Sequence, residues 1–190
     1  MNDICAETGV WLRDTTQGHE FDLQLCESIN FYLEECGASS LYDLGCGHGL
    51  YTSVLRSKGI DCSGYDGNPF TKQITGGLCE VLDLSKPVDL APKDFVLCLE
   101  VGEHVPRKFE DEVISNIHKS CRRGVILSWA VENQPGEGHV NCRNNDYIEK
   151  IFIDLGYTQN HLWQNILREK SNLSWFKNTI MIFEKNDNKI

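Results

Sequence analysis

The chain has 190 residues, of which 41% are hydrophobic and 24% are charged. These values are ordinary for a soluble globular protein and exclude disorder over most of the chain. With 18 Lys and Arg against 28 Asp and Glu, the formal net charge is −10, which works against binding to phosphate backbones. The length suits one domain, so we treat residues 1–190 as a single unit, in which residues 1–37 form an N-terminal cover and helix and residues 38–185 form a sheet core.

The sequence contains no signal for a membrane or for export. No run approaches the roughly 20 consecutive apolar residues that span a bilayer, and the first residues lack the basic and then apolar layout of a signal peptide. We therefore expect a cytoplasmic protein. The nine Cys stand singly, without a C-x-x-C pair, so we expect them to pack as small buried hydrophobes rather than to form metal fingers or a disulfide framework.

The first half of the chain alternates helix-like and strand-like segments. Apolar residues at helical spacing predict an amphipathic helix over residues 20–36, which stops before Gly37. We then expect a strand at 39–45, a helix from Leu50 to Lys58 and a strand at about 60–65. A short turn or helix follows Pro69, and another strand lies near 78–82.

The second half continues this alternation. We expect a strand at 94–100, a helix that begins at Pro106, a strand at 124–130, and a helix capped by Asn144 and closed by Gly156. Two final apolar runs, around 160–168 and 178–184, are predicted to be strands that pair antiparallel with no helix between them.

Strands that alternate with helices imply an α/β fold, with a mainly parallel sheet covered on both faces. In such sheets, ligands bind beyond the carboxyl ends of the strands, where the strand order reverses. Functional residues are therefore expected in the loops after residues 44, 65, 82, 99 and 129.

The strongest functional signal is the segment DLGCGHG at residues 43–49, where the first predicted strand ends. Its glycines are Gly45, Gly47 and Gly49. Glycines permit a tight turn and a close approach of the backbone to a ligand, and Asp43 can accept hydrogen bonds from an amine. A dinucleotide fingerprint that starts at Gly45 requires Gly or Ala at position 50, where Leu50 stands, so NAD is disfavoured.

This D-x-G-x-G-x-G pattern resembles motif I of the class I S-adenosylmethionine-dependent methyltransferases. Asp66 ends the next predicted strand about 20 residues after Gly47, with Gly67 beside it, a position suited to holding a ribose diol. The resemblance covers about residues 38–185. It implies S-adenosylmethionine as the cofactor and a Rossmann-like sandwich, with a seven-stranded, mostly parallel sheet whose last strand is antiparallel.

The same resemblance implies further cofactor contacts. Asp83, after the third strand, matches the acidic residue that meets the adenine amino group in that family, and Leu84 offers its backbone N–H. Leu99, at the end of the fourth strand, is expected near the methionine part of the cofactor. An ordinary turn or capping role for Asp83 remains an alternative.

A second constellation, Glu100, Glu103 and His104, follows the fourth predicted strand as E-x-x-E-H. Residues three and four apart share one face of a helical turn, so two carboxylates and an imidazole would lie together and suit Mg²⁺ or Mn²⁺. His139, in the glycine-rich loop after the fifth strand, is expected as a fourth ligand or as a base. The pattern is similar to that of metal-dependent O-methyltransferases, including those of ubiquinone synthesis and those acting on small-RNA 3′ ends.

A metal-free reading stays open, because many class I enzymes carry E-H at this place. There, Glu100 and Glu103 contact the cofactor or cap a helix while His104 shapes the pocket, and His104 or His139 is the candidate general base. The polar segment 130–146 is expected to meet the acceptor through His139, Asn141 and Arg143. His19 belongs to a possible N-terminal cover. Core or rim packing is the expected role of Trp129, Trp163 and Trp175.

These features predict methyl transfer from S-adenosylmethionine to an oxygen, in preference to a nitrogen, of a small polar acceptor. The −10 charge disfavours a long nucleic acid and leaves an RNA terminus as an alternative acceptor. The rival functions are a noncatalytic S-adenosylmethionine-binding sensor or scaffold and an NAD-dependent reductase. The identity of the acceptor and the oligomeric state are not encoded in any recognisable pattern.

Overall fold

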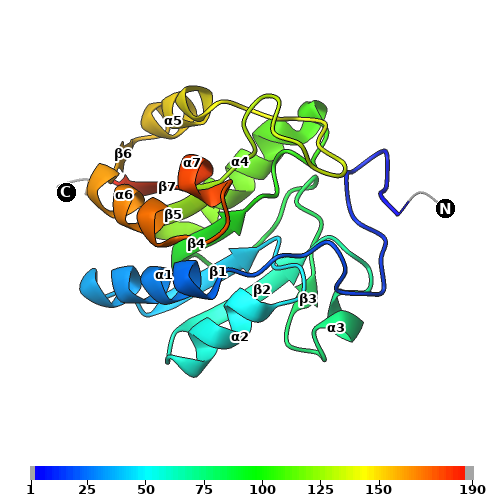
Figure 1. Cartoon of the computed structure of the whole chain (residues 1–190), viewed down its shortest axis with the longest axis horizontal. Helices are drawn as coiled ribbons and strands as arrows, with labels where there is room; N and C mark the ends of the chain where they lie inside the picture. The colour runs from blue at the N-terminus through cyan, green and yellow to red at the C-terminus, as the bar shows by residue number, and fades with distance from the viewer. Residues whose placement is uncertain (1–2, 187–190) are drawn as a thin grey trace.

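A computed structural model of the chain describes residues 3–186. Its centre is a seven-stranded sheet in the order β3-β2-β1-β4-β5-β7-β6, in which β7 runs antiparallel to both of its neighbours and the other six strands are parallel (Figure 1). The strands are β1 Ser40–Leu44, β2 Asp61–Asp66, β3 Glu80–Val81, β4 Lys93–Leu99, β5 Cys121–Ser128, β6 Tyr157–Gln159 and β7 Met181–Lys185. The predicted mostly parallel sheet with an antiparallel last strand is confirmed.

Helices cover both faces of the sheet and divide the core in two (Figure 1). The helices are α1 Leu23–Glu35, α2 Leu50–Ser57, α3 Thr71–Ile74, η1 Arg107–Phe109, α4 Glu110–Lys119, α5 Asn145–Asp154, α6 His161–Lys170 and α7 Phe176–Thr179. One core cluster joins α1, α2, α6 and α7 to one face, and the other joins α4 and α5 to the opposite face. Because both faces of the sheet are buried, the central strands have nearly continuous apolar sequences.

The first helix is anchored by a buried cap. Asp22 accepts a hydrogen bond from the backbone N–H of Leu25 (3.1 Å), which satisfies one free donor at the start of α1. The same carboxylate accepts from the Ser171 hydroxyl (2.6 Å) and from the Leu173 N–H (3.0 Å), beyond the end of α6. One side chain therefore joins the N-terminal helix to the chain between α6 and α7.

The strand predicted at 160–168 is wrong, because α6 occupies this segment. Asn160 caps the helix by accepting from the Trp163 N–H (3.1 Å), and Leu167, one turn after Trp163, is fully buried. Two-residue alternation and helical spacing are hard to separate in a short apolar run. The expected antiparallel pairing exists, but its first strand is β6, which ends before the helix begins.

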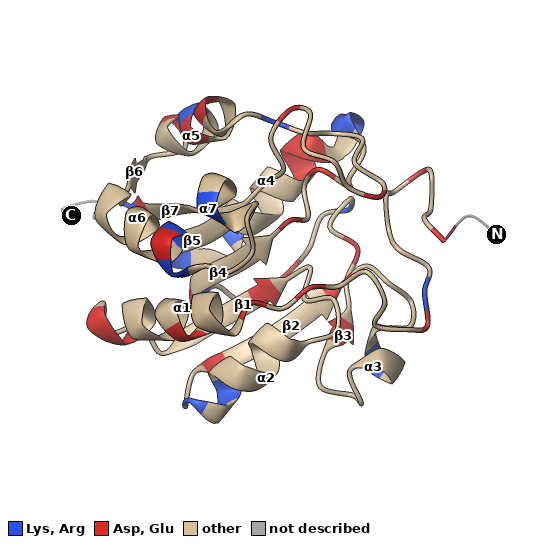
Figure 2. Cartoon of the chain, viewed as in Figure 1, with Lys and Arg blue, Asp and Glu red and all other residues tan. Residues whose placement is uncertain are grey.

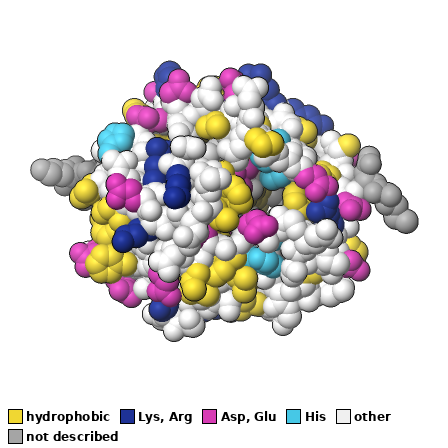
Figure 3. Space-filling view, in the orientation of Figure 1, with side chains coloured by type: hydrophobic (Ala, Val, Ile, Leu, Met, Phe, Trp, Pro, Cys, Tyr) yellow, Lys and Arg dark blue, Asp and Glu magenta, His cyan; other side chains and the backbone are white. Residues whose placement is uncertain are grey.

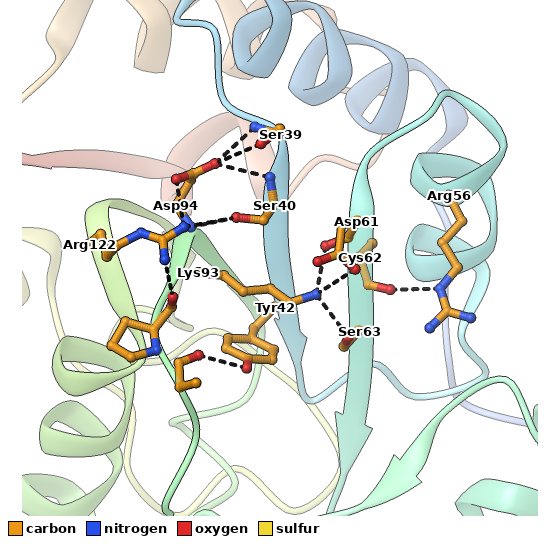
Figure 4. A network of polar contacts seen from close by, with 12 residues as sticks. Ser39, Ser40, Tyr42, Arg56, Asp61, Cys62, Ser63, Lys93, Asp94 and Arg122 are labelled. Atoms are coloured by element: carbon orange, nitrogen blue, oxygen red, sulfur yellow. Dashed lines mark hydrogen bonds and ion pairs between the residues drawn. The ribbon is translucent and has the colours of Figure 1, made fainter.

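The amino ends of the strands are joined by polar contacts on the side of the sheet away from the carboxyl ends (Figure 4). Asp94 accepts from the backbone N–H groups of Ser39 (2.9 Å) and Ser40 (3.1 Å) and from the Arg122 guanidinium (3.0 Å). Lys93 donates to the carbonyl oxygen of Asp61 (2.7 Å). These contacts align β1, β2 and β4, so the loops at their carboxyl ends start from fixed positions.

Within residues 3–186, no helix combines the length and the apolar character needed to cross a membrane.

Candidate active site

A cavity of about 390 Å³ lies at the carboxyl ends of β1, β2 and β4. Figure 3 shows His and acidic side chains beside the hollowed part of this face of the molecule. The cavity is lined by the loops after these strands, by the N-terminal segment, by the loop after β5 and by the chain around Trp175. Its place agrees with the rule that parallel sheets bind ligands where the strand order reverses, here between β1 and β4.

The glycine loop after β1 needs its glycines for two separate reasons. Gly45, Gly47 and Gly49 have φ values of 82°, 53° and 76°, in the left-handed region that favours glycine. A Cβ atom on Gly45 would stand 2.2 Å from Val101 Cγ2, and one on Gly47 would stand 2.6 Å from His19 Nδ1. The loop therefore lies directly against the turn after β4 and against the N-terminal segment.

Two carboxylates, the buried Asp43 and the partly exposed Asp66, hold this loop to its neighbours. Asp66 accepts from the backbone N–H groups of Gly47 (2.9 Å) and Asn68 (2.9 Å), one on each oxygen, and each oxygen keeps a lone pair for a ligand. Asp43 accepts from the Thr52 hydroxyl (2.7 Å), and burial raises the pKa of Asp43 to about 6. Both residues line the cavity together with Gly45, Gly47 and Gly67, whereas Gly49 packs behind it against Cys79.

Asp83, Leu84 and Leu99 also line the cavity. Asp83 shapes its own turn, because its Oδ1 accepts from the N–H (2.9 Å) and the hydroxyl (2.6 Å) of Ser85, while its Oδ2 pairs with Lys86 at 2.9 Å. Burial works to raise the pKa of Asp83, but these contacts outweigh it and lower the pKa. The turn role and a ligand role are compatible, because a carboxylate has about four acceptor positions.

The turn after β4 is strained at its first residue. Glu100 has φ 52°, a conformation that costs a non-glycine residue about 1–2 kcal/mol. Its carboxylate accepts from Gln134 Nε2 (2.7 Å) and from the Thr179 hydroxyl (3.2 Å). The side chain of Glu100 therefore joins the loop after β5 to α7.

Three of the four predicted metal-site residues come together. Glu103, His104 and His139 each offer a ligand atom within 4.8 Å of the others, and Glu100 is not part of this group. The rings of His104 and His139 meet edge to face at 5.0 Å between centroids. The segment forms turns rather than a helix, which is why Glu100 and Glu103 do not share one face with His104 as predicted.

Backbone contacts bring His139 to this place. The Glu103 carbonyl accepts from the N–H groups of Val140 and Asn141, both at 2.9 Å, so the loop after β5 is bound to the turn after β4. His139 Nδ1 lies 3.1 Å from the Gln134 carbonyl oxygen. A ring that donates from Nδ1 to a carbonyl presents the Nε2 lone pair, the arrangement found in histidine metal ligands.

Burial dominates the electrostatics of the cluster. Glu103 is fully buried, and neither of its carboxylate oxygens has a hydrogen-bond partner. Burial and the nearby Glu100 carboxylate raise the pKa of Glu103 well above its usual range. Burial and His139 lower the pKa of His104 to about 4, so this imidazole is neutral at pH 7 and free to ligate.

The unpartnered polar atoms of Glu103 and His104 fit a divalent cation. A buried carboxylate without a partner is costly, and so is the buried, unpartnered Nδ1 of His104. One cation held by Glu103, His104 and His139 would satisfy both atoms and favour the charged form of Glu103. One carboxylate and two imidazoles make a mixed donor set that suits Mn²⁺ or Zn²⁺ better than Mg²⁺.

Two residues expected to meet the acceptor do not line the cavity. Arg143 pairs with Glu110 at 2.6 Å, and its guanidinium lies over the Tyr147 ring, 4.8 Å from the centroid. Asn141 is buried, and its carbonyl accepts from the Trp129 indole N–H (2.7 Å). Both residues therefore hold the loop that carries His139. Trp129 is buried packing as predicted, while Trp175 lines the cavity.

The N-terminal segment, residues 3–22, lines the cavity with Val10, Trp11 and His19. The sequence predicted a cover with His19 here but not the contributions of Val10 and Trp11. The Trp11 ring stands edge-on to His104 at 5.5 Å and lies 5.1 Å from the ring of His19. Arg13 pairs with Asp3 and Glu137. The sequence W-L-R at residues 11–13 was the available signal for a covering segment. The segment has no regular residue spacing, so the sequence does not show what it covers.

The cavity is rich in carboxylates and poor in cations. Its lining includes Glu20, Asp43, Asp66, Asp83, Glu100 and Glu137, and no Lys or Arg from the described part of the chain. Figure 2 shows that Asp and Glu predominate over Lys and Arg in the loops at this edge of the sheet. An anionic ligand therefore finds only neutral donors here, such as backbone N–H groups, imidazoles and hydroxyls.

Comparison with solved structures identifies the fold. Magnesium protoporphyrin IX methyltransferase (ChlM) from Synechocystis PCC 6803 with bound SAM is 20% identical over 86% of this chain and 79% of that chain, with a TM-score of 0.66. The N-methyltransferase NodS from Bradyrhizobium japonicum WM9 in complex with S-adenosyl-L-homocysteine is 14% identical over 86% of each chain, with a TM-score of 0.63. The methyltransferase domain of bacterial CtHen1-C is 16% identical over 86% of this chain and 97% of that chain, with a TM-score of 0.62.

No protein-family model matches the chain, and no curated protein matches it. At identities of 14–20%, the structural likeness shows the fold alone. The predicted Rossmann-like class I methyltransferase sandwich is confirmed at that level.

Proposed function

We propose that the chain is an S-adenosylmethionine-dependent methyltransferase. The observation that carries this proposal is that one cavity contains both halves of such a site. The glycine loop, Asp43 and Asp66 make up a donor half, and His104 and His139 border an acceptor half. Solved neighbours of the same fold have SAM or S-adenosylhomocysteine bound, which supports the same ligand here.

In the donor half, Asp66 binds the ribose hydroxyls and Asp83 meets the adenine amino group, with Leu84 and Leu99 packing beside the nucleoside and the methionine part. Gly45, Gly47 and Gly67 keep the backbone clear for the ligand, and Gly49 allows the turn into α2. Asp43, buried at the base of the loop, accepts from the cofactor ammonium. The sulfonium is already activated, so the residues mainly have to align donor and acceptor.

In the acceptor half, Glu103, His104 and His139 hold a divalent cation, with Glu100 positioning Gln134 and thereby the loop of His139. When bound, the cation supplies Lewis acidity that lowers the pKa of an acceptor hydroxyl. Without a cation, His139 or His104 is the general base that takes the hydroxyl proton. Mn²⁺ and Zn²⁺ are favoured by the two imidazoles, with Mg²⁺ as the third candidate.

The acceptor is a small, oxygen-rich molecule without a phosphate. The cavity lining offers no Lys or Arg among the described residues to neutralise one, and the chain carries a net charge of −10. This disfavours an RNA terminus, the alternative acceptor. The loop after β5 and the N-terminal segment both line the cavity, where they would limit the access of water to the reacting atoms.

The test is methyl transfer from labelled S-adenosylmethionine across a panel of diols, phenols, carboxylic acids and RNA 3′ ends, with and without a chelator. Chelator-sensitive transfer to a small hydroxyl compound supports the proposal. Binding of the cofactor without transfer to any acceptor would instead indicate the sensor or scaffold. Calorimetric binding of NAD in place of S-adenosylhomocysteine would indicate the reductase.

A further inference from the structure

Two histidines that neither the donor half nor the acceptor half uses lie beside the glycine loop. His19 comes from the N-terminal segment and His48 from the loop itself, and their ring centroids are 5.7 Å apart. Both line the cavity. The ring of His19 packs against Gly47, where even a Cβ atom would stand 2.6 Å from its Nδ1.

Each of these imidazoles has one buried nitrogen without a partner, Nε2 in His19 and Nδ1 in His48. A buried polar atom left unpaired costs about 1–3 kcal/mol, and two of them beside one cavity indicate a missing ligand group. Burial lowers the pKa of both rings, so each is neutral in the unliganded protein and carries one N–H donor.

Each ring can carry its N–H on the unpartnered nitrogen, and an acceptor would then complete it. The charges of the cavity restrict where an anion can bind. No Lys or Arg among the described residues lines the cavity, and the guanidinium of Arg13, on the N-terminal segment, is already paired with Asp3 and Glu137. His19 and His48 are the side chains beside the glycine loop that have a buried, unpartnered nitrogen, so they are the donors that we consider for an anion. The carboxylates of Asp43 and Asp66 also line the cavity and disfavour an anion close to them.

The proposed function supplies such an anion. With the nucleoside at Asp66 and the methyl group facing His104 and His139, the third branch of S-adenosylmethionine is its amino acid end, which carries an ammonium and a carboxylate. We propose that His19 and His48 together bind the α-carboxylate of the cofactor, while Asp43 takes the ammonium. This assignment rests on the proposed function and gives the N-terminal segment a direct role in cofactor binding.

The experiment compares two ligands that differ only in this group. Binding of S-adenosylhomocysteine and of its decarboxylated analogue, which keeps the nucleoside, sulfur and amine, is measured by calorimetry on the full chain. The variants are His19→Leu and His48→Leu, with Asp66→Ala as a control on the ribose side and His161→Leu, exposed on α6, as a neutral control.

We expect each histidine variant to bind S-adenosylhomocysteine roughly tenfold more weakly, because a hydrogen bond to a charged group is lost. The same variants should bind the decarboxylated analogue within about twofold of the unmodified protein. Calorimetry separates a tenfold from a twofold change in affinity. Asp66→Ala should weaken both ligands equally. His48→Asn, which keeps a donor, should recover part of the loss.

Equal weakening of both ligands by a histidine variant would show a packing role and overturn the assignment, and so would unchanged affinity for S-adenosylhomocysteine. If the unmodified protein binds neither ligand, the proposed function fails and this inference fails with it. If it binds both ligands equally well, only the carboxylate assignment fails. Because the two ligands are compared within each variant, partial unfolding does not mimic the expected result.

Discussion

Gly136 lies directly against the ring of His139: a Cβ atom on Gly136 would stand 2.0 Å from His139 Nε2. This nitrogen is the one that His139 presents to the cluster, because its Nδ1 faces the Gln134 carbonyl. The absence of a side chain at position 136 is therefore a condition for the position of the candidate metal ligand. The same loop is fixed from the other side by the Glu103 carbonyl.

Gly136→Ala should displace the His139 ring and lower metal-supported turnover at least about tenfold, the size of effect seen when support of a metal ligand is lost. Affinity for S-adenosylhomocysteine should stay unchanged, since the donor half lies on other strands. Turnover and calorimetry measure the two effects. Adding His139→Ala to Gly136→Ala should cause little further loss, and a large further loss would contradict the explanation.

Glu103→Gln should weaken Mn²⁺ or Zn²⁺ binding and reduce methyl transfer about as much as EDTA does in the unmodified protein, because the amide keeps the shape and removes the charge. Metal titration followed by labelled-methyl assays provides the measurement. Glu132→Gln, exposed in the loop after β5, is the matched control and should behave as the unmodified protein. Full activity in EDTA would assign these residues to a metal-free pocket, with His104 or His139 as base.

Asp66→Ala should weaken S-adenosylhomocysteine binding by about 1–3 kcal/mol, because hydrogen bonds from the ribose to a carboxylate are lost. The variant also removes the acceptor of the Gly47 N–H, so Asp66→Asn is measured beside it. Asp61→Ala, at the other end of β2, controls for the loss of a charge. Calorimetric affinity that is unchanged in Asp66→Ala would rule out the ribose assignment.

Arg13→Gln should loosen the N-terminal segment, since Arg13 joins Asp3 and Glu137 and lies over the Trp11 ring. Hydrogen exchange across residues 3–22 should rise, and affinity for S-adenosylhomocysteine should fall roughly fivefold, corresponding to about 1 kcal/mol for partly exposed ion pairs. Arg107→Gln, exposed at the start of η1, is the control. Exchange rates that match the unmodified protein would mean that other contacts hold the segment.

Asp94→Asn should destabilise the fold by about 1–3 kcal/mol at pH 7. Burial works to raise the pKa of Asp94, but the Ser39 and Ser40 N–H groups and Arg122 outweigh it and hold the pKa well below its usual range. A lowered folded-state pKa gives stability that is complete above the unfolded value of about 4 and is lost as the pH falls through the folded value. Urea unfolding at pH 7 and pH 3 should show the gap between the two proteins narrowing at pH 3. A gap that does not change with pH would contradict this account.

The local patterns of the sequence were sufficient for most of the sheet and for the glycine turn at the end of β1. The alternation of elements predicted a mostly parallel sheet, and the spacing from Asp43 to Gly49 predicted the turn at the end of β1, because each depends on neighbouring residues and backbone geometry. The short run at 160–168 was misread because helix and strand differ there only in which residues meet the core, and Trp163 and Leu167 face it from a helix.

The acceptor half could be predicted only in part. The sequence alone brought Glu103, His104 and His139 into one hypothesis, since the loops after β4 and β5 belong to adjacent strands. It could not show that Glu100 turns to Gln134 and Thr179 or that Arg143 pairs with Glu110. It predicted an N-terminal cover with His19 but not that Trp11 lines the cavity beside it. These outcomes depend on contacts between residues far apart in the chain. Such contacts are decided by the competition of buried polar groups for partners, which exists only once the tertiary structure has formed.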